Sequence, residues 1–370
     1  MSTYERVLTS LRDRPRTWVV TGVAGFIGSN LLEALLRLDQ RVVGLDNFST
    51  GRTANLAQVK RAVTPAQWAS FRLIHGDIGT FDTCRDACER ADVVLHHAAL
   101  ASVPHSLEDP IAAHRANASG FLNMLIAARD SDAARFVYAS SSAVYGDDPS
   151  GKKVEHRTGR MISPYAATKY VNELYADVFA RCYALQCVGL RYFNVFGARQ
   201  DPDGPYAAVI PQWLIGMLRG EPVYINGDGQ TVRDFCYIDD VIQANLRAAT
   251  VEDPEALNQV CNIAAGSETT LQALFEMIRS LLERRCPHLR GLRPGYREFR
   301  AGDVRHSQAD IAKARRLLGY EPRWSVQEGL ARTIDWYAAN FGRRRPLSDS
   351  PVGALQYASG AGPVPGHHTG

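Results

Sequence analysis

The chain has 370 residues, of which 45% are hydrophobic, so it can bury a sizeable core in one large domain or two fused lobes. The formal net charge is only +3 and the basic residues are spread out, which excludes the usual signature of a nucleic-acid-binding protein. Seven scattered cysteines fit neither a disulfide framework nor a zinc site, and no apolar run reaches membrane-spanning length. We therefore expect a cytoplasmic protein without a metal, a membrane or a nucleic acid as its partner.

Short apolar, β-branched runs alternate with longer helical patterns in the first half of the chain. The expected strands are TWVVTG (17–22), RVVGLD (41–46), FRLIHGD (71–77), DVVLHHAA (92–99), RFVYAS (135–140) and CVGLRYF (187–193). Between the first two, SNLLEALLRLDQ repeats apolar residues at helical spacing. Strands that alternate with helices imply βαβ units. The sequence thus predicts an α/β fold with a Rossmann-type, doubly wound parallel sheet.

The second half of the chain shows a different pattern of predicted elements, with shorter strands and helices separated by glycine-rich segments. We expect a Rossmann domain over 18–204 and mainly a smaller α/β substrate-binding lobe over 205–343. FCYIDDVIQANLRAA reads as a turn that feeds a long helix, so segments near 234–265 are expected to return to the first domain. Residues 1–17 are expected to form a helical extension. Residues 344–370, rich in Gly, Pro and Ser, are expected to form a disordered tail.

A glycine-rich turn follows the first strand, where TGVAGFIGSNLLEALL carries Gly22, Gly25 and Gly28. Glycines allow a tight turn and a close approach of a pyrophosphate, and the helix N-terminus supplies amide donors. Asp46 ends the second strand, where a carboxylate accepts hydrogen bonds from the adenosine ribose and repels a 2′-phosphate. The sequence therefore favours NAD over NADP, although Arg52 lies close enough in the sequence to serve a phosphate.

The next two strands end with residues that suit the ligand-binding edge of an open α/β sheet. These are Asp77 after the third strand and Ala98 and Ala99 after the fourth. His96 and His97 read as strand-end histidines, because no third metal ligand follows at a suitable spacing.

A possible general base lies in SPYAATKYVNELY, where Tyr165 and Lys169 fall one helical turn apart. The ammonium group can stabilise a phenolate, so we expect a lowered Tyr165 pKa. The fifth strand ends at the same edge with hydroxyls at Ser140, Ser141 and Ser142. A phenolate, a serine hydroxyl and a nicotinamide ring together remove a proton from an alcohol while hydride leaves its carbon.

The order TGxxGxxG, strand-ending aspartate, SSSxxYG, YxxxK and LRYFNVFG resembles the extended short-chain dehydrogenase/reductases that act on nucleotide sugars. The resemblance runs from about Trp18 to Trp336. Within this family the chain is most similar to the UDP-hexose 4-epimerases. It is especially similar to the branch that acts on UDP-N-acetylglucosamine, including members from bacterial surface-polysaccharide pathways. The similarity to that branch extends to YERVLTSLRDRPRTW and TVRDFCYIDD.

The resemblance implies a catalytic cycle. Tyr165 takes the proton from the sugar 4-hydroxyl as hydride passes to NAD, a 4-keto intermediate turns within the site, and hydride returns to its opposite face. The resemblance places the catalytic hydroxyl at Ser141, with Ser142 as the neighbouring alternative. Dehydratase relatives carry an Asp-Glu pair after that hydroxyl, and this chain has Ser142 and Ala143 instead. Loss of water is therefore disfavoured.

The resemblance also implies the full set of cofactor contacts. The residues expected to bind NAD are Gly22, Gly25, Phe26, Ile27, Gly28, Asp46, Asn47, Phe48, Thr50, Gly51, Asp77, Ile78, His97, Ala98, Ala99, Asn117, Tyr165, Lys169 and Tyr192.

For the nucleotide part of the substrate, the resemblance implies contacts in the second half of the chain. Asn194 is expected at the diphosphate, together with Arg233 and Arg300, whose guanidinium groups suit that charge. Asp303 is expected at the ribose, and Tyr224 and Asn226 at the uracil. The expected substrate set is completed by Ser102, Ser141, Ser142, Tyr165, Ala208, Val209 and Ser307.

Ser307 is the position expected to decide sugar size. In relatives restricted to unacetylated sugars a tyrosine narrows the pocket there, and its overlap with an acetamido group would cost roughly 1–3 kcal/mol or more. Ala101 and Ala208 are also small. We therefore predict a homodimeric enzyme that interconverts UDP-N-acetylglucosamine and UDP-N-acetylgalactosamine. Arg305 and His306 leave open a 4-epimerase of UDP-N-acetylhexosaminuronate. A Rossmann-fold NAD sensor without turnover is the alternative from another class.

Overall fold

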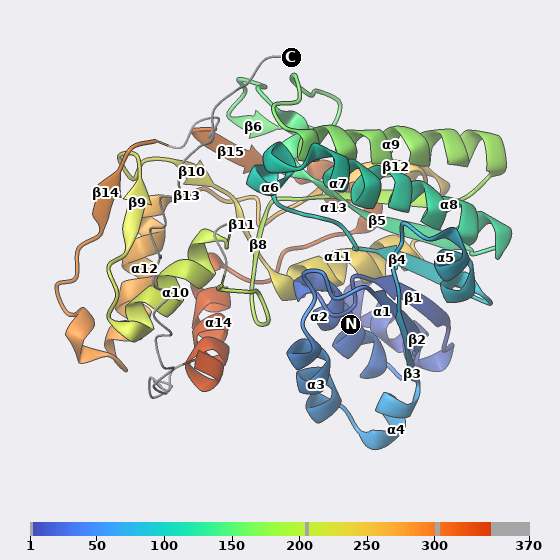
Figure 1. Ribbon diagram of the computed structural model, residues 1–370, viewed down its shortest axis with the longest axis horizontal. Coiled ribbons are helices and arrows are strands. Elements are labelled where there is room, and N and C mark those ends of the chain that lie inside the picture. Colours follow the sequence, from blue (N-terminus) through green and yellow to red (C-terminus); the bar gives the residue numbers. More distant parts are fainter. Residues whose placement is uncertain (1–2, 204–206, 300–303, 342–370) are drawn as a thin grey trace, which may run out of the picture.

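The computed structural model describes residues 3–203, 207–299 and 304–341. Figure 1 shows a large sheet with its helices on the right and a smaller body of short strands and helices on the left. Arg300, Asp303 and the tail expected over 344–370 lie outside the described residues.

A seven-stranded sheet forms the larger body, with the strand order β12-β7-β5-β4-β1-β2-β3. All of its neighbouring pairs are parallel, which confirms the expected fold class. The order reverses between β1 and β4, and open sheets of this type bind ligands at such a reversal. The strands are β1 (Thr17–Thr21), β2 (Arg41–Asp46), β3 (Phe71–His75), β4 (Val93–His96), β5 (Arg135–Ser141), β7 (Cys187–Tyr192) and β12 (Gln259–Ile263).

Helices cover both faces of this sheet, because successive strand residues point to opposite sides. In β1, Val20 packs into the core shared with α2, whereas Val19 packs into the core shared with α5, α8 and α9. The helices of this body are α2 (Phe26–Leu36), α3 (Thr53–Ala62), α4 (Pro65–Ala69), α5 (Phe81–Cys88), α6 (Val103–Glu108), α7 (Pro110–His114), α8 (Gly120–Asp130), α9 (Pro164–Tyr183) and α11 (Ile238–Thr250). The short η1 (Arg115–Ser119) is a π-helical turn between α7 and α8.

The N-terminal segment forms α1 (Thr3–Asp13), which packs against α11. The buried Gln40 side chain joins it to the sheet: its amide donates to the Leu11 carbonyl at 2.8 Å and accepts from Trp18 Nε1 at 3.0 Å. The extension is therefore part of the large body.

The smaller body contains three short sheets, with the orders β13-β10-β15-β6, β11-β8 and β14-β9. Its strands are β6 (Lys152–Lys153), β8 (Asn194–Phe196), β9 (Tyr224–Asn226), β10 (Val232–Arg233), β11 (Phe235–Tyr237), β13 (Thr269–Thr270), β14 (Gly295–Arg297) and β15 (His306–Ala309). Its helices are α10 (Val209–Arg219), α12 (Leu271–Glu283), α13 (Ala312–Leu318) and α14 (Val326–Phe341), and the single turns η2 (Ser142–Tyr145), η3 (Pro254–Ala256) and η4 (Pro287–Leu289) complete the description. Between β11 and β13 the chain returns to the large sheet as α11 and β12. Within the described residues, no helix has the length and apolar character needed to cross a membrane.

Candidate active site

A cavity of about 490 Å³ lies along the carboxyl edge of the large sheet, where the strand order reverses. Its walls bring together most of the residues expected at a dinucleotide. Those that line it are Gly22, Gly25, Phe26, Ile27, Gly28, Asp46, Asn47, Thr50, Gly51, Asp77, Ile78, His97, Ala98, Ala99, Tyr165, Lys169 and Tyr192.

The glycine turn forms one wall of this cavity and has no room for side chains. Gly22 has a φ of 68°, and a β-carbon built there would lie 2.9 Å from the Ala98 backbone nitrogen. A β-carbon on Gly28 would lie 2.0 Å from the Gly22 carbonyl oxygen. Helix α2 begins immediately after Gly25, so its first amide groups face the cavity that Gly25 and Phe26 line. This cradle fits a pyrophosphate.

Asp46 is held rigidly at the end of β2. Its carboxylate accepts from the backbone amides of Ala24 and Phe48, each at 2.8 Å, and each oxygen keeps acceptor capacity for a ribose hydroxyl. Arg52, which could have served a 2′-phosphate, instead pairs with Asp201 at 2.5 Å and with Asp203 at 3.4 Å. The fit is therefore to NAD.

Two of the expected cofactor residues, Phe48 and Asn117, do not line the cavity and instead support its walls. Asn117 is buried at the π-helical turn, where its side chain accepts from Leu100 N at 2.8 Å and donates to Leu100 O at 3.0 Å. Phe48 packs edge-on against His75 and donates its backbone amide to Asp46. The sequence alone does not distinguish residues that line the cavity from residues, such as these two, that support the lining.

Helix α9 carries Tyr165 and Lys169 to the other end of the cavity. Ser163 caps the helix by accepting from Ala166 N, and Pro164 occupies its first position, so the helix starts one residue before Tyr165. The Tyr165 amide donates to Ser106 Oγ at 3.1 Å, which fixes the first turn against α6. Lys169 is 2% exposed, and its ammonium group donates to the Ala139 carbonyl at 3.0 Å.

The expected lowering of the Tyr165 pKa is not what the protein alone produces. Burial raises the pKa of Tyr165, and the hydrogen bond with Ser141 opposes that rise in part. Burial also lowers the pKa of Lys169 to about 8. Helical spacing correctly brings the two side chains to one cavity, but it contains no information about how completely the fold would desolvate them.

The three serines at the end of β5 differ in their positions and in their hydrogen-bond partners. Ser140 lines the cavity, and its hydroxyl donates to the buried Glu173 carboxylate on α9 at 2.5 Å. Ser141 Oγ accepts from Ala143 N at 3.1 Å, so its own proton is available to the Tyr165 oxygen. Ser142 begins the η2 turn. Of the three hydroxyls, that of Ser141 is the one whose hydrogen bonding opposes the rise in the Tyr165 pKa.

A second tyrosine, Tyr192, lines the same end but is held in place by its hydroxyl. Asn245 Nδ2 donates to that hydroxyl at 2.8 Å, and the hydroxyl lies 2.9 Å from His97 Nε2. Burial lowers the His97 pKa to about 3, so the imidazole is neutral. The Tyr192 hydroxyl is therefore held between two neutral side chains, Asn245 and His97.

The residues expected at the nucleotide sugar lie mostly on the smaller body, outside the lining of this cavity. β10 and β15 pair so that Arg233 lies opposite Ser307. Tyr224 on β9 is partly exposed, and the Arg297 guanidinium stacks 3.6 Å from its ring centre. The remaining members are also placed: Asn194 is exposed at the start of β8, Asn226 ends β9, Ala208 caps α10, Val209 begins that helix, and Ser102 caps α6 through His105 N. Arg300 and Asp303 lie outside the described residues.

Comparison with known proteins shows the family to which the chain belongs. The sequence signature of the NAD dependent epimerase/dehydratase family matches residues 18–264. The chain belongs to this family. It is therefore an NAD-dependent enzyme of the epimerase class, as the glycine cradle and Asp46 indicate. Its fold is that of the extended short-chain dehydrogenase/reductases.

Several members of the family are similar over nearly their whole length. A UDP-N-acetylglucosamine 4-epimerase from Methanobrevibacter ruminantium M1, solved with UDP-N-acetylmuramic acid, is 36% identical with a TM-score of 0.80, covering 88% of this chain and 99% of that one. A UDP-glucuronic acid 4-epimerase from Bacillus cereus, solved with NAD and a fluorinated UDP-glucuronic acid, is 31% identical with a TM-score of 0.76 over 88% and 99%. The UDP-glucose 4-epimerase of Mycolicibacterium smegmatis is 34% identical over 86% of this chain and 97% of its own.

The epimerase fold also places residues at the cavity that sequence reasoning missed. Arg115 lines the wall near Asp77 from the π-helical turn, and Ala112 and Ala116 line it as well. An arginine on a helix surface carries no local signal of a ligand.

Proposed function

We propose that the chain is an NAD-dependent 4-epimerase that interconverts UDP-N-acetylglucosamine and UDP-N-acetylgalactosamine. One observation carries the reaction: the cavity that holds the glycine cradle and Asp46 at one end holds Tyr165 and Lys169 at the other. An alcohol that reaches Tyr165 would therefore lie beside the cofactor. The family supports the same reaction class.

The protein's own groups supply proton transfer at a sugar hydroxyl. The Tyr165 phenolate accepts the proton of the substrate 4-hydroxyl, and Ser141 donates a hydrogen bond that stabilises the phenolate. The buried Lys169 ammonium group favours the anionic form of Tyr165 through its positive charge. NAD, when bound, accepts hydride from the same carbon and returns it. The Tyr165 phenol then returns its proton to the 4-keto oxygen, which gives the epimer after the ring has turned.

The preference for an N-acetylated sugar rests on Ser307. Its side chain is partly buried on β15, beside Arg233 on β10. A serine at this position leaves room for an acetamido group, and the relative from Methanobrevibacter ruminantium acts on UDP-N-acetylglucosamine. The roles proposed for Asn194, Tyr224 and Asn226 at the nucleotide follow from the same resemblance.

A 4-epimerase of a UDP-hexosaminuronate is the second candidate, because the relatives include a UDP-glucuronic acid 4-epimerase at similar identity. Arg305, the residue that could recognise the carboxylate, pairs with Asp228 at 2.6 Å and lies over the Phe299 ring. This pairing reduces its availability for a substrate. His306 is exposed.

The test is product analysis with purified protein and no added NAD. UDP-N-acetylglucosamine, UDP-glucose, UDP-glucuronate and UDP-N-acetylglucosaminuronate are incubated in parallel, and the 4-epimers are separated by chromatography. The proposal expects the highest kcat/KM with UDP-N-acetylglucosamine. A higher kcat/KM with a uronate would favour the second candidate over the first. If none of the four UDP-sugars gave a 4-epimer, the proposed reaction would be contradicted.

We also propose that the enzyme is a homodimer, as the resemblance implies. Large apolar side chains are exposed on adjacent helices: Leu107 on α6, Ile111 on α7, and Leu174 and Val178 one turn apart on α9. Figure 1 shows these helices together on one side of the large sheet. Such a patch suits a matching patch on a second copy. Sedimentation of the Ile111→Glu variant should show monomers where the unaltered protein sediments as dimers.

A further inference from the structure

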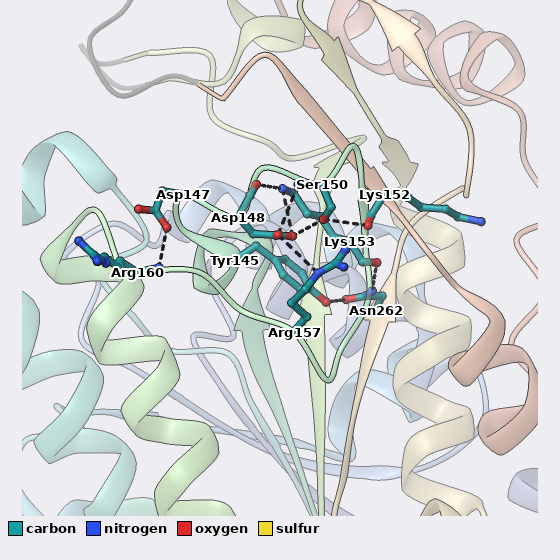
Figure 2. Close-up of polar contacts among 9 residues, drawn as sticks. All are labelled: Tyr145, Asp147, Asp148, Ser150, Lys152, Lys153, Arg157, Arg160 and Asn262. Carbon is teal, nitrogen blue, oxygen red and sulfur yellow. Dashed lines mark hydrogen bonds and ion pairs between the residues drawn. The ribbon is translucent and has the colours of Figure 1, made fainter.

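The segment from residue 145 to residue 155, here called the strap, connects the catalytic edge to the smaller body. Figure 2 shows its polar contacts, and both of its ends are fixed to the large sheet. At the first end the Tyr145 hydroxyl donates to Asn262 Oδ1 at 2.6 Å, and at the second the Glu155 carbonyl accepts from Arg191 at 3.1 Å. The strap follows Ser141 after only the η2 turn, so its position is tied to the catalytic hydroxyl.

The middle of the strap is β6, which pairs with β15 of the smaller body. Lys152 lies opposite Gln308 and Lys153 opposite Ala309, and the Lys153 carbonyl accepts from Asp310 N at 2.9 Å. β15 in turn pairs with β10, which brings Ser307 beside Arg233. The chain itself therefore leads from the catalytic edge into β6, and strand pairing continues from β6 through β15 to β10, where the residues proposed at the sugar and the diphosphate lie.

A buried ion pair fixes the shape of the strap. Lys153 Nζ donates to the Asp148 carbonyl at 2.5 Å and lies 3.5 Å from the Asp148 carboxylate, and the two side chains are 2% and 4% exposed. The same carboxylate accepts from the Ser150 hydroxyl and, at 3.3 Å, from Ser150 N (Figure 2). A buried charge pair of this kind adds little net stability but permits few alternative arrangements of the chain around it.

We propose that Lys153 is a positioning residue for substrate binding, which acts by holding β15 in register with the catalytic edge. None of the residues that line the cofactor cavity belongs to the strap or to β15. Loss of Lys153 therefore changes the substrate side of the site and leaves the NAD side as it is. The inference rests on the proposed function, since it takes β10 and β15 as the strands that meet the UDP-sugar.

The test compares Lys153→Met with Lys152→Met, the adjacent and exposed lysine of the same strand. Steady-state kinetics with the UDP-sugar that the unaltered enzyme turns over best should show KM raised at least about tenfold in Lys153→Met, with kcat within about threefold. NAD content after purification should be unchanged. Lys152→Met should stay within about twofold of the unaltered enzyme in both constants.

A double variant, Asp148→Asn with Lys153→Met, separates positioning from folding, because it leaves no unpaired buried charge. We expect its thermal midpoint to recover while KM stays high. The proposal is overturned if Lys153→Met lowers kcat and NAD content together, if its KM is normal, or if the double variant recovers both the midpoint and KM. Calorimetric titration with UDP gives a second readout that needs no turnover. Weaker UDP binding by Lys153→Met than by the unaltered enzyme supports the positioning role of Lys153, even if the proposed sugar is wrong. Equal UDP binding by the two proteins overturns that role.

Discussion

The cofactor side and the substrate side of this site are built in different ways. On the cofactor side, each group comes from the end of a parallel strand or the first turn of the helix that follows, as with Gly22, Asp46 and Tyr165. On the proposed substrate side, Arg233 and Ser307 lie on strands of two to four residues that hold their places by pairing with one another. The first side depends on local geometry and the second on cooperation between distant segments. Substitutions should therefore abolish function on the first side and tune it on the second.

The largest effect is expected for Tyr165→Phe. The phenol is the proposed acceptor of the substrate proton, so kcat should fall by about 1000-fold, within the range of general base catalysis. NAD content should remain, because the glycine cradle is untouched. Tyr192→Phe is the matched variant: the Tyr192 hydroxyl is held by His97 and Asn245, so we expect less than about a tenfold loss. Equal losses in the two variants, measured as kcat with UDP-N-acetylglucosamine, would contradict the assignment of the base.

Lys169→Met should separate activity from stability. The folded-state pKa of Lys169, about 8, lies below its ordinary value of 10.5, so burial of the ammonium group costs stability at pH 7 and this cost disappears as the pH rises from 8 to 10.5. We expect the variant to lose about 100-fold in kcat. Its free energy of unfolding should rise by about 2 kcal/mol at pH 7.

Urea denaturation at pH 7 and pH 10 measures this difference. The gain in stability should shrink at pH 10. At that pH Lys169 of the unaltered protein is neutral in the folded state, so its burial no longer costs the energy of desolvating a charge. A gain that stays the same at both values would mean that the change in side-chain packing, and not the charge, is responsible.

Gly28→Ala tests the cradle. The new methyl group would lie 2.0 Å from the Gly22 carbonyl oxygen, and because that oxygen belongs to the backbone and the methyl carbon is attached directly to the backbone at residue 28, the turn must open. Retained NAD should fall about tenfold or more, as measured by absorbance after denaturation of the purified enzyme. Gly25→Ala meets the same oxygen at 3.1 Å, so it should retain more NAD than Gly28→Ala. The reverse order would contradict the steric account.

Ser307→Tyr should give the smallest change, and a selective one. The ring would fill the space proposed for the acetamido group, which lowers kcat/KM for UDP-N-acetylglucosamine about tenfold relative to UDP-glucose. Ser307→Ala leaves the volume open and should preserve the ratio. The measurement is kcat/KM for both sugars in parallel assays. Equal losses of kcat/KM on the two sugars would show that Ser307 does not determine the preference between them.

The same comparison explains what the sequence could predict. Glycine spacing, strand-ending residues and the helical interval between Tyr165 and Lys169 are local patterns, and they located the cavity correctly. Partners distant in sequence cannot be predicted from these local patterns: Arg52 is neutralised by Asp201 and Asp203, and Tyr192, at the end of β7, is held by Asn245 of helix α11. The direction of the Tyr165 pKa shift was missed for the same reason, since burial depends on the whole fold.

The return of the chain to the large sheet has a practical consequence. β12 pairs along β7, and it does so only after the chain has already built α10 and β8 to β11. A shortened gene product that stops before residue 234 would lack β12 and leave β7 as an open edge, ready to associate with other strands. Excision of either half is therefore a route to aggregation, and grafting a new sugar specificity onto this scaffold requires exchange of loops within an intact polypeptide.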